Sequence, residues 1–177
     1  MMITSSAQAM EILDDVREEV TFREAAIRYL AKEPTPAVTA RLVQALQDDD
    51  FSVRWEAAIA VTQLGVTGVL EVLKALTDPE RVGDPRLRDS AYHILHLSRA
   101  AVPVSITDLL GALKGQAADI ASLVEANHVL RNWKKYQLAE ARAARQAGTK
   151  DATKVNIPGP KYAPARLTGD LGRLAKH

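Results

Sequence analysis

Two histidines three positions apart are the residues best suited to metal chemistry in this chain. His93 and His96 form an HxxH pattern, a spacing that can place both imidazoles on one side of a helix for a metal ion. No third ligand follows at a characteristic spacing, and the residues around the pair are those of an ordinary apolar helix. We therefore expect helix positions here rather than a metal site.

Three consecutive carboxylates offer a second kind of chemistry. Asp48, Asp49 and Asp50 could bind a divalent cation or act as paired acid and base. They stand between two helical segments, where solvated aspartates and one helix N-cap are sufficient to explain them. The other polar residues stand in no nucleophile elbow or other recognised catalytic frame. The chain has no cysteine, which removes thiolate chemistry. We expect no enzyme, no metal and no cofactor, and small-molecule binding is not favoured.

Charge is divided unevenly along the chain, although the net charge is only +1. Residues 1–130 carry 12 Lys and Arg against 19 Asp and Glu, a net charge of −7. Residues 131–177 carry 11 against 3, a net charge of +8. The two parts are electrostatically opposite, so an acidic protein surface, a nucleic acid or an anionic membrane could attract the basic part.

The end of the chain has the composition of a tail. The segment after Gly148 contains three prolines and three glycines and has no periodic apolar face, so we expect residues 148–177 to lack a core of their own. Solvated disorder, docking on a protein partner, and contact with nucleic acid or a membrane are the open interpretations. The basic and apolar side chains that could make such contacts are Lys161, Tyr162, Arg166, Leu171 and Leu174.

The overall composition predicts one helical domain in addition to the tail. Of 177 residues, 47% are hydrophobic and only 5% are aromatic, which favours helices over a β-sandwich. The N-terminus lacks the basic and apolar regions of a cleaved signal, and no window reaches the roughly 18 apolar residues of a membrane helix. We expect a cytoplasmic protein.

The histidine pair and the aspartate run lie within a region where one sequence pattern occurs three times. An acid-x-x-apolar-Arg sequence starts at Glu19, Asp50 and Asp84, with offsets of 31 and 34 residues between the copies. Each copy opens an apolar-periodic segment, and a second segment with an apolar-apolar-x-x-Leu frame follows it. In the middle copy the Gly65–Gly68 segment separates the two. Each copy therefore predicts a helical hairpin, which must stack on neighbours to bury its apolar stripes.

Further segments extend this pattern at both ends. Residues 5–18 predict an N-terminal capping helix with Leu13 and Val16 on one apolar stripe. Residues 116–147 predict a closing helix that packs on the third hairpin and places Trp133 in the core, whereas its end beyond Tyr136 has few large apolar residues and should project. We expect the segment from residue 78 to residue 87 to lengthen one inter-repeat loop.

The repeated acid-x-x-apolar-Arg-x-x-Ala signature, paired with a leucine-rich second helix, resembles HEAT-type repeats over residues 19–115. It is similar in particular to the short HEAT-like repeats of phycobilisome-lyase-like proteins and bacterial scaffolds. This resemblance implies an all-α fold, a short right-handed α-solenoid of three to four hairpins. We place it in residues 1–147, followed by the extended tail over residues 148–177.

The resemblance also implies structural roles for the signature residues. Asp50 and Asp84 would cap their helices, while Arg54 and Arg88 would reach neighbouring carbonyls or acids to form a ladder between repeats. Arg23 is the equivalent arginine in the first copy, where Glu19 is a poorer N-cap than aspartate. The resemblance does not imply lyase chemistry, because the chain lacks cysteine and a dense aromatic pocket.

Trp55 is the remaining candidate contact. The equivalent positions in the other two copies are Glu24 and Asp89, which predicts an exposed site. Its ring could be a binding hot spot or could cover an adjacent repeat, and both interpretations stay open.

We therefore expect a non-enzymatic scaffold or accessory subunit that binds a protein partner, with an acidic solenoid and a basic docking arm. A nucleic-acid-associated module that binds through the basic C-terminal region is the alternative. An accessory factor for a pigment protein is a weaker one.

Overall fold

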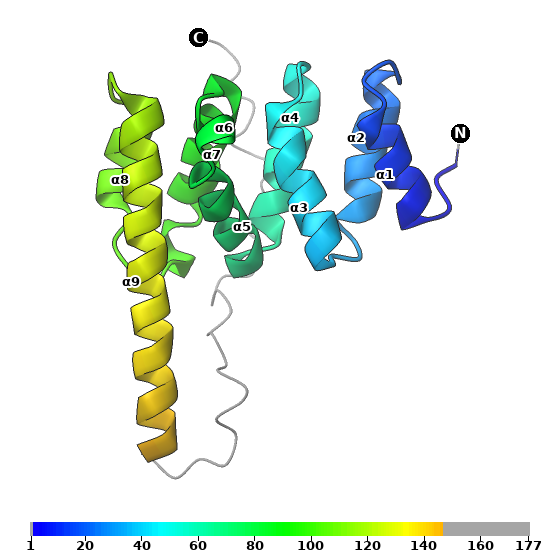
Figure 1. Ribbon diagram of the computed structural model, residues 1–177. Coiled ribbons are helices and arrows are strands. Elements are labelled where there is room, and N and C mark those ends of the chain that lie inside the picture. The colour runs from blue at the N-terminus through cyan, green and yellow to red at the C-terminus, as the bar shows by residue number, and fades with distance from the viewer. Residues whose placement is uncertain (1, 147–177) are drawn as a thin grey trace.

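The computed structural model describes residues 2–146, which contain helices and turns but no strand. Figure 1 shows the helices as a row of packed pairs that runs from α1 to α9. The elements are α1 (Ser6–Asp14), α2 (Val20–Leu30), α3 (Pro36–Gln44), the 3-10 turn η1 (Ala45–Gln47), α4 (Phe51–Gln63), α5 (Val66–Leu76), α6 (Pro79–Val82), α7 (Pro85–Leu97), the 3-10 turn η2 (Arg99–Ala101), α8 (Thr107–Leu113) and α9 (Ala118–Gln146). The expected all-α solenoid is confirmed, while its right-handed sense stays a prediction. The expected tail lies outside the described residues.

Short polar side chains begin most of these helices. Each of them accepts a hydrogen bond from a backbone N–H of the first turn, which satisfies a donor that the helix itself leaves unpaired. The residues that do so are Ser5, Thr35, Asp50, Asp78 and Asp84. Glu19 stands at the same position before α2 but makes no such bond, as expected of the longer side chain.

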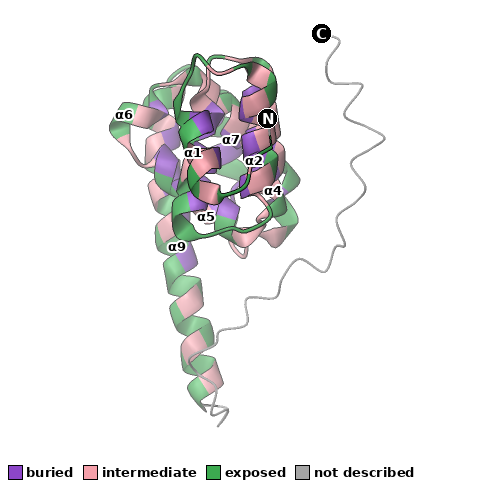
Figure 2. Ribbon diagram, turned by 90° about the vertical axis from the view of Figure 1, so that its right-hand side faces the viewer, coloured by how far each residue is buried: buried purple, intermediate pink, exposed green. Residues whose placement is uncertain are grey.

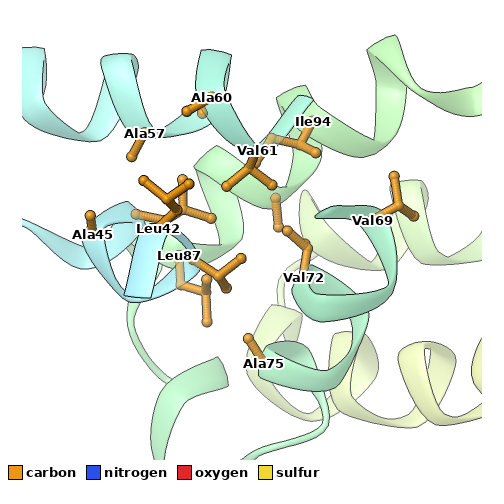
Figure 3. Close-up of a cluster of buried hydrophobic side chains, with 14 of the residues drawn as sticks. Leu42, Ala45, Ala57, Ala60, Val61, Val69, Val72, Ala75, Leu87 and Ile94 are labelled. Carbon is orange, nitrogen blue, oxygen red and sulfur yellow. The ribbon is translucent and has the colours of Figure 1, made fainter. Parts of the chain in front are cut away.

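The helices form two layers with a continuous apolar core between them. In the first layer α2 packs against α4 and α4 against α7, while in the second α3 packs against α5 and α5 against α9. Figure 3 shows side chains from several of these helices pointing toward one another. The buried apolar residues run from Ala9 to Trp133. Burial of each large aliphatic side chain contributes about 1.5–3 kcal/mol, which makes this core the main source of stability.

Gly68 is a point of close approach rather than part of the break between helices. The turn is made by Gly65, whose φ of 58° lies in the left-handed region that favours glycine. Gly68 lies inside α5, and a Cβ atom built on it would stand 2.1 Å from the backbone oxygen of Val61 in α4. The second glycine therefore lets two helices of one hairpin come together.

Two local predictions were wrong. The first helix ends at Asp14 instead of residue 18, so Val16 lies beyond it and is 71% exposed. The expected 78–87 loop contains the one-turn helix α6, because Asp78 caps it and Val82 is buried beneath it. The closing helix packs against α8 of the third hairpin, as expected, and it also packs against α5 and α6, where it takes the second-layer place beside α5. With only seven residues, α8 is about 10 Å long and too short to cover α5.

The long helix α9 has a packed half and a projecting half. Ala126, Val129 and Trp133 are buried against the body, which confirms the expected core position of the tryptophan. Beyond them α9 extends well past the other helices (Figure 1), and Figure 2 shows no buried residue in its far half. The projection expected beyond Tyr136 is confirmed. None of the helices in residues 2–146 combines the length and apolar character needed to cross a membrane.

Candidate interaction surfaces

A network of arginines and aspartates follows the rim where the first-layer helices begin. Arg23 in the first turn of α2 forms an ion pair with Asp48, in the turn before α4, with 2.5 Å between Nη1 and Oδ2. The two side chains are only 7% and 8% exposed. Asp48 also accepts the backbone N–H of Asp50 at 2.9 Å. This pair links the first hairpin to the start of the second.

The two other arginines of the repeated pattern bind backbone carbonyls. Nη1 of Arg54 donates to the carbonyl oxygens of Asp48 and Asp49 at 2.7 and 2.9 Å, and Nη1 of Arg88 donates to that of Val82 at 2.6 Å. Residues 48 and 82 each lie six positions before the arginine, so the two copies share one geometry. Both arginines hold the turn in front of their own helix. Their proposed effect on repeat coupling stays a prediction.

Asp84 connects the start of the third hairpin to the turn between the first and second hairpins. Its carboxylate accepts Nε2 of Gln47 at 3.3 Å and Nε of Arg86 at 3.1 Å, while Arg86 also pairs with Asp49. Burial acts to raise the pKa of Asp84, but the hydrogen bonds from Arg86 and Gln47 outweigh it and lower the pKa below 3.8. The same bonds from Asp84 and Asp49 raise the pKa of Arg86. The aspartate run is therefore tied into the repeat junctions.

Trp55 lies at the boundary between α4 and α7. Its half-buried ring stacks on Phe51, with 6.2 Å between the centroids and 17° between the planes. We call the depression beside it the Trp55 hollow, and its lining residues are Trp55, Ala58, Ile59, Thr62, His93, Ile94 and Leu97. Phe51 at its edge is 65% exposed and Leu97 is 57% exposed. Trp55 thus borders the same hollow as residues of the next repeat and also lies beside an accessible apolar surface.

The size of the Trp55 hollow restricts what it can bind. Its volume is about 20 Å³, whereas pockets for small molecules usually have volumes of about 300–1,000 Å³. There is room for a single small apolar group of an approaching side chain. The exposed rings and aliphatic groups around it provide the remaining contact area, an arrangement that suits a protein partner.

A larger groove of about 580 Å³ lies at the opposite rim, between the turn of the first hairpin and that of the second. Four of its polar side chains are engaged in hydrogen bonds or an ion pair. Thr35 caps α3, the Thr39 hydroxyl donates to the Thr35 carbonyl, and Lys74 pairs with Glu71 at 3.0 Å. Most of the polar side chains of the groove are therefore already engaged, and those of Gln63 and Thr67 are left to orient a ligand.

The histidine pair is engaged with an aromatic neighbour. His96 stacks on Tyr92 with 5.8 Å between the ring centroids, and His93 meets the same ring edge-on at 5.7 Å. Nζ of Lys114 lies over the Tyr92 ring, 3.8 Å from its centroid. Within residues 2–146 no three His, Asp or Glu side chains form a group that could hold a metal ion.

Sequence reasoning found only part of these surfaces. It singled out Trp55 but missed Phe51 and Leu97, although Phe51 could have been noticed as a large apolar residue directly after the N-cap of α4. The partner of Trp55 across the repeat boundary carries no local signal. The tail candidates Lys161, Tyr162, Arg166, Leu171 and Leu174 lie outside the described residues.

The stacked hairpins, the aspartate caps and the arginine-fastened turns define an α-solenoid of the repeat type. Residues 7–95, about half of the chain, match the family of HEAT repeats. The chain belongs to the HEAT-repeat family. Repeats of this family generally mediate protein–protein interaction or scaffolding and are typically non-enzymatic. No curated protein and no solved structure matches the chain.

Proposed function

We propose that the protein is a non-enzymatic interaction subunit, and that the outer face of α4 and α7 around the Trp55 hollow binds a protein partner. The observation that carries this proposal is the exposure of Phe51 and Leu97 beside the half-buried Trp55. Aromatic residues at the centre of a partly desolvated surface supply much of the binding energy of protein interfaces. A nucleic-acid duplex would gain little from such an apolar patch, because it presents its phosphates.

The rest of the chain supports an accessory role in a larger assembly. Residues 1–130 form an acidic solenoid, and the basic charge is concentrated after residue 130. We propose that residues 148–177 act as a docking arm on the same assembly. Every buried apolar residue of the described part lies between Ala9 and Trp133, so the arm is not needed for this core. Deletion of residues 148–177 should weaken partner capture and leave the thermal midpoint nearly unchanged.

The Trp55 hollow is tested by affinity purification with Phe51→Ser and Leu97→Ser variants. Both side chains are largely exposed, so Leu97→Ser should retain the stability of the wild type within about 0.5 kcal/mol, and Phe51→Ser, which loses the stacking on Trp55, within about 1.5 kcal/mol. Val16→Ser is the matched control. Val16 is about as exposed as Phe51 and Leu97, but it lies in the turn after α1 and does not line the Trp55 hollow. We expect a stoichiometric protein that wild type and Val16→Ser recover and that the two hollow variants lose.

The same purification separates the alternatives. If all variants recover the same proteins, the Trp55 hollow is not the contact surface. If nuclease treatment removes every partner from the wild type, the chain acts through nucleic acid and the proposal of a protein scaffold is wrong.

A further inference from the structure

The outward face of α9 carries a row of basic side chains along its projecting half. All five of them are exposed. At 100° per residue of an α-helix, they fall within an arc of about 100°, and over about 21 Å of helix length. These residues are Arg131, Lys134, Lys135, Arg142 and Arg145.

The same arc continues as an apolar strip in the packed half of the helix. Ile120 and Val124 are 68% and 53% exposed, and Leu138, which stands among the basic residues, is 51% exposed. The side of α9 that contacts the body, with Val129 and Trp133, faces the opposite way by the same geometry. We call the combined face the α9 stripe, and it is about 38 Å long from residue 120 to residue 145.

The charges of the α9 stripe are not neutralised locally. None of its five cations forms an ion pair or hydrogen bond with another residue of the described chain, whereas most arginines of the repeats do. The acidic residues of α9 are Asp119, Glu125 and Glu140. At 100° per residue all three fall outside the arc. The stripe is thus an unpartnered basic and apolar surface.

We propose that the α9 stripe binds an acidic amphipathic helix of a protein partner. The carboxylates of that helix pair with the five cations, and its apolar residues cover Ile120, Val124 and Leu138. A helix of about 25 residues matches the length of the stripe. This surface lies on a different element from the Trp55 hollow, so the two proposals stand or fall separately.

Charge and chemistry favour this occupant over two others. Pairing of the stripe with the same stripe of a second copy would place the cations of Arg131 and Lys135 against one another, which is repulsive. A nucleic acid could neutralise the cations, but its phosphates would leave the exposed aliphatic side chains of Ile120 and Leu138 without a partner. A helix that combines carboxylates with apolar residues satisfies both parts.

The test uses the full-length protein and a fluorescein-labelled helical peptide of 25 residues, designed with Leu at every third or fourth position and Glu on either side. A peptide with Gln in place of Glu is the matched probe. Binding is followed by fluorescence anisotropy, and hydrogen exchange locates the site. We expect the Glu peptide to bind at least about tenfold more tightly than the Gln peptide, to lose affinity as salt is raised, and to protect α9.

The α9 stripe is then altered in two ways. The charge-reversal variant R131E/K135E/R142E and the apolar variant I120S/V124S should each bind the Glu peptide at least about tenfold more weakly than the wild type. The control R17E/K32E/R99E changes the net charge equally at exposed positions of the body and should bind as the wild type does. All of the altered side chains are exposed or at helix surfaces, so the fold is retained.

Four results would overturn the proposal. Equal affinity of the Glu peptide for the wild type and the charge-reversal variant would show that the stripe does not bind such a helix. Binding that does not saturate by about 100 µM peptide, a concentration at which weak complexes form, would show the same. Tight binding of a 21-base-pair DNA that the charge-reversal variant loses, without binding of the peptide, would assign the cations to nucleic acid. Salt-sensitive self-association that the same variant abolishes would assign them to a second copy.

Discussion

Replacement of Arg23 by alanine should uncouple the first hairpin from the second. Arg23 and Asp48 are 7% and 8% exposed and 2.5 Å apart, so loss of the guanidinium leaves a buried carboxylate without its cation. Removal of one partner of a buried ion pair costs about 3–5 kcal/mol. Asp48 keeps the hydrogen bond from the Asp50 backbone at 2.9 Å, which places the expected loss near the lower limit, at about 3 kcal/mol. With a urea slope of about 2–3 kcal/mol per molar, the unfolding midpoint should fall by about 1–1.5 M.

Urea unfolding followed by circular dichroism measures this loss, and two variants serve as controls. Arg28 pairs with Glu24 and Glu56 on the surface and is 52% exposed, so Arg28→Ala should cost less than about 1 kcal/mol. The double variant R23M/D48N has no unpaired buried carboxylate and keeps a hydrogen-bond acceptor at residue 48. It should therefore recover most of the free energy of unfolding that Arg23→Ala loses. Hydrogen exchange should show α1 and α2 opening first in Arg23→Ala. Equal effects of Arg23→Ala and Arg28→Ala would refute the reasoning, because they would mean that the pair is solvated.

Three further changes test the repeat junctions and the helix crossings. Arg54→Ala removes two hydrogen bonds to backbone carbonyls and should lower the free energy of unfolding by about 1–3 kcal/mol, and an unchanged urea midpoint would contradict the proposed ladder. Gly68→Ala forces a Cβ atom against the Val61 carbonyl and should lower the free energy of unfolding by about 1–3 kcal/mol. Gly111→Ala lies in open space within α8 and should raise that free energy by up to about 1 kcal/mol. Thermal midpoints from calorimetry that move in the same direction for both variants would refute the close approach at Gly68. The pKa of Asp84 is lowered in the folded state, so its contribution to stability is present above the unfolded pKa near 3.8 and is lost as the pH falls below it. Asp84→Asn should therefore unfold with a weaker pH dependence below pH 3.8 in an acid titration, and an identical dependence would exclude this linkage.

Much of the fold could be predicted because its signals are local. An aspartate N-cap acts on N–H groups two or three residues away, so Asp50 and Asp84 could be placed from the sequence alone. The helical spacing of apolar residues predicted the hairpins and the burial of Trp133. The scarcity of large apolar residues beyond Tyr136 predicted the projecting end of α9 for the same reason.

The candidate surfaces were predicted less completely, because they depend on residues from different hairpins. The sequence indicated that Trp55 was unusual, but the hollow exists only where α4 meets Leu97 at the end of α7. The outward orientation of the α9 stripe likewise depends on which side of α9 the body covers. In the sequence Arg131 and Lys135 show only that the segment is basic.

The repeat, the helix starts and the division of charge can all be read from the order of residues, because each depends on residue types within a few turns of helix. The packing of the helices is needed to see that Arg23 pairs with Asp48 across 25 positions, and that α9 rather than α8 lies beside α5. Both outcomes depend on competition between surfaces for the same place in the stack. Helix length and the shape of the side chains at each crossing decide that competition, and neither quantity is carried by the periodic pattern that defines the repeat.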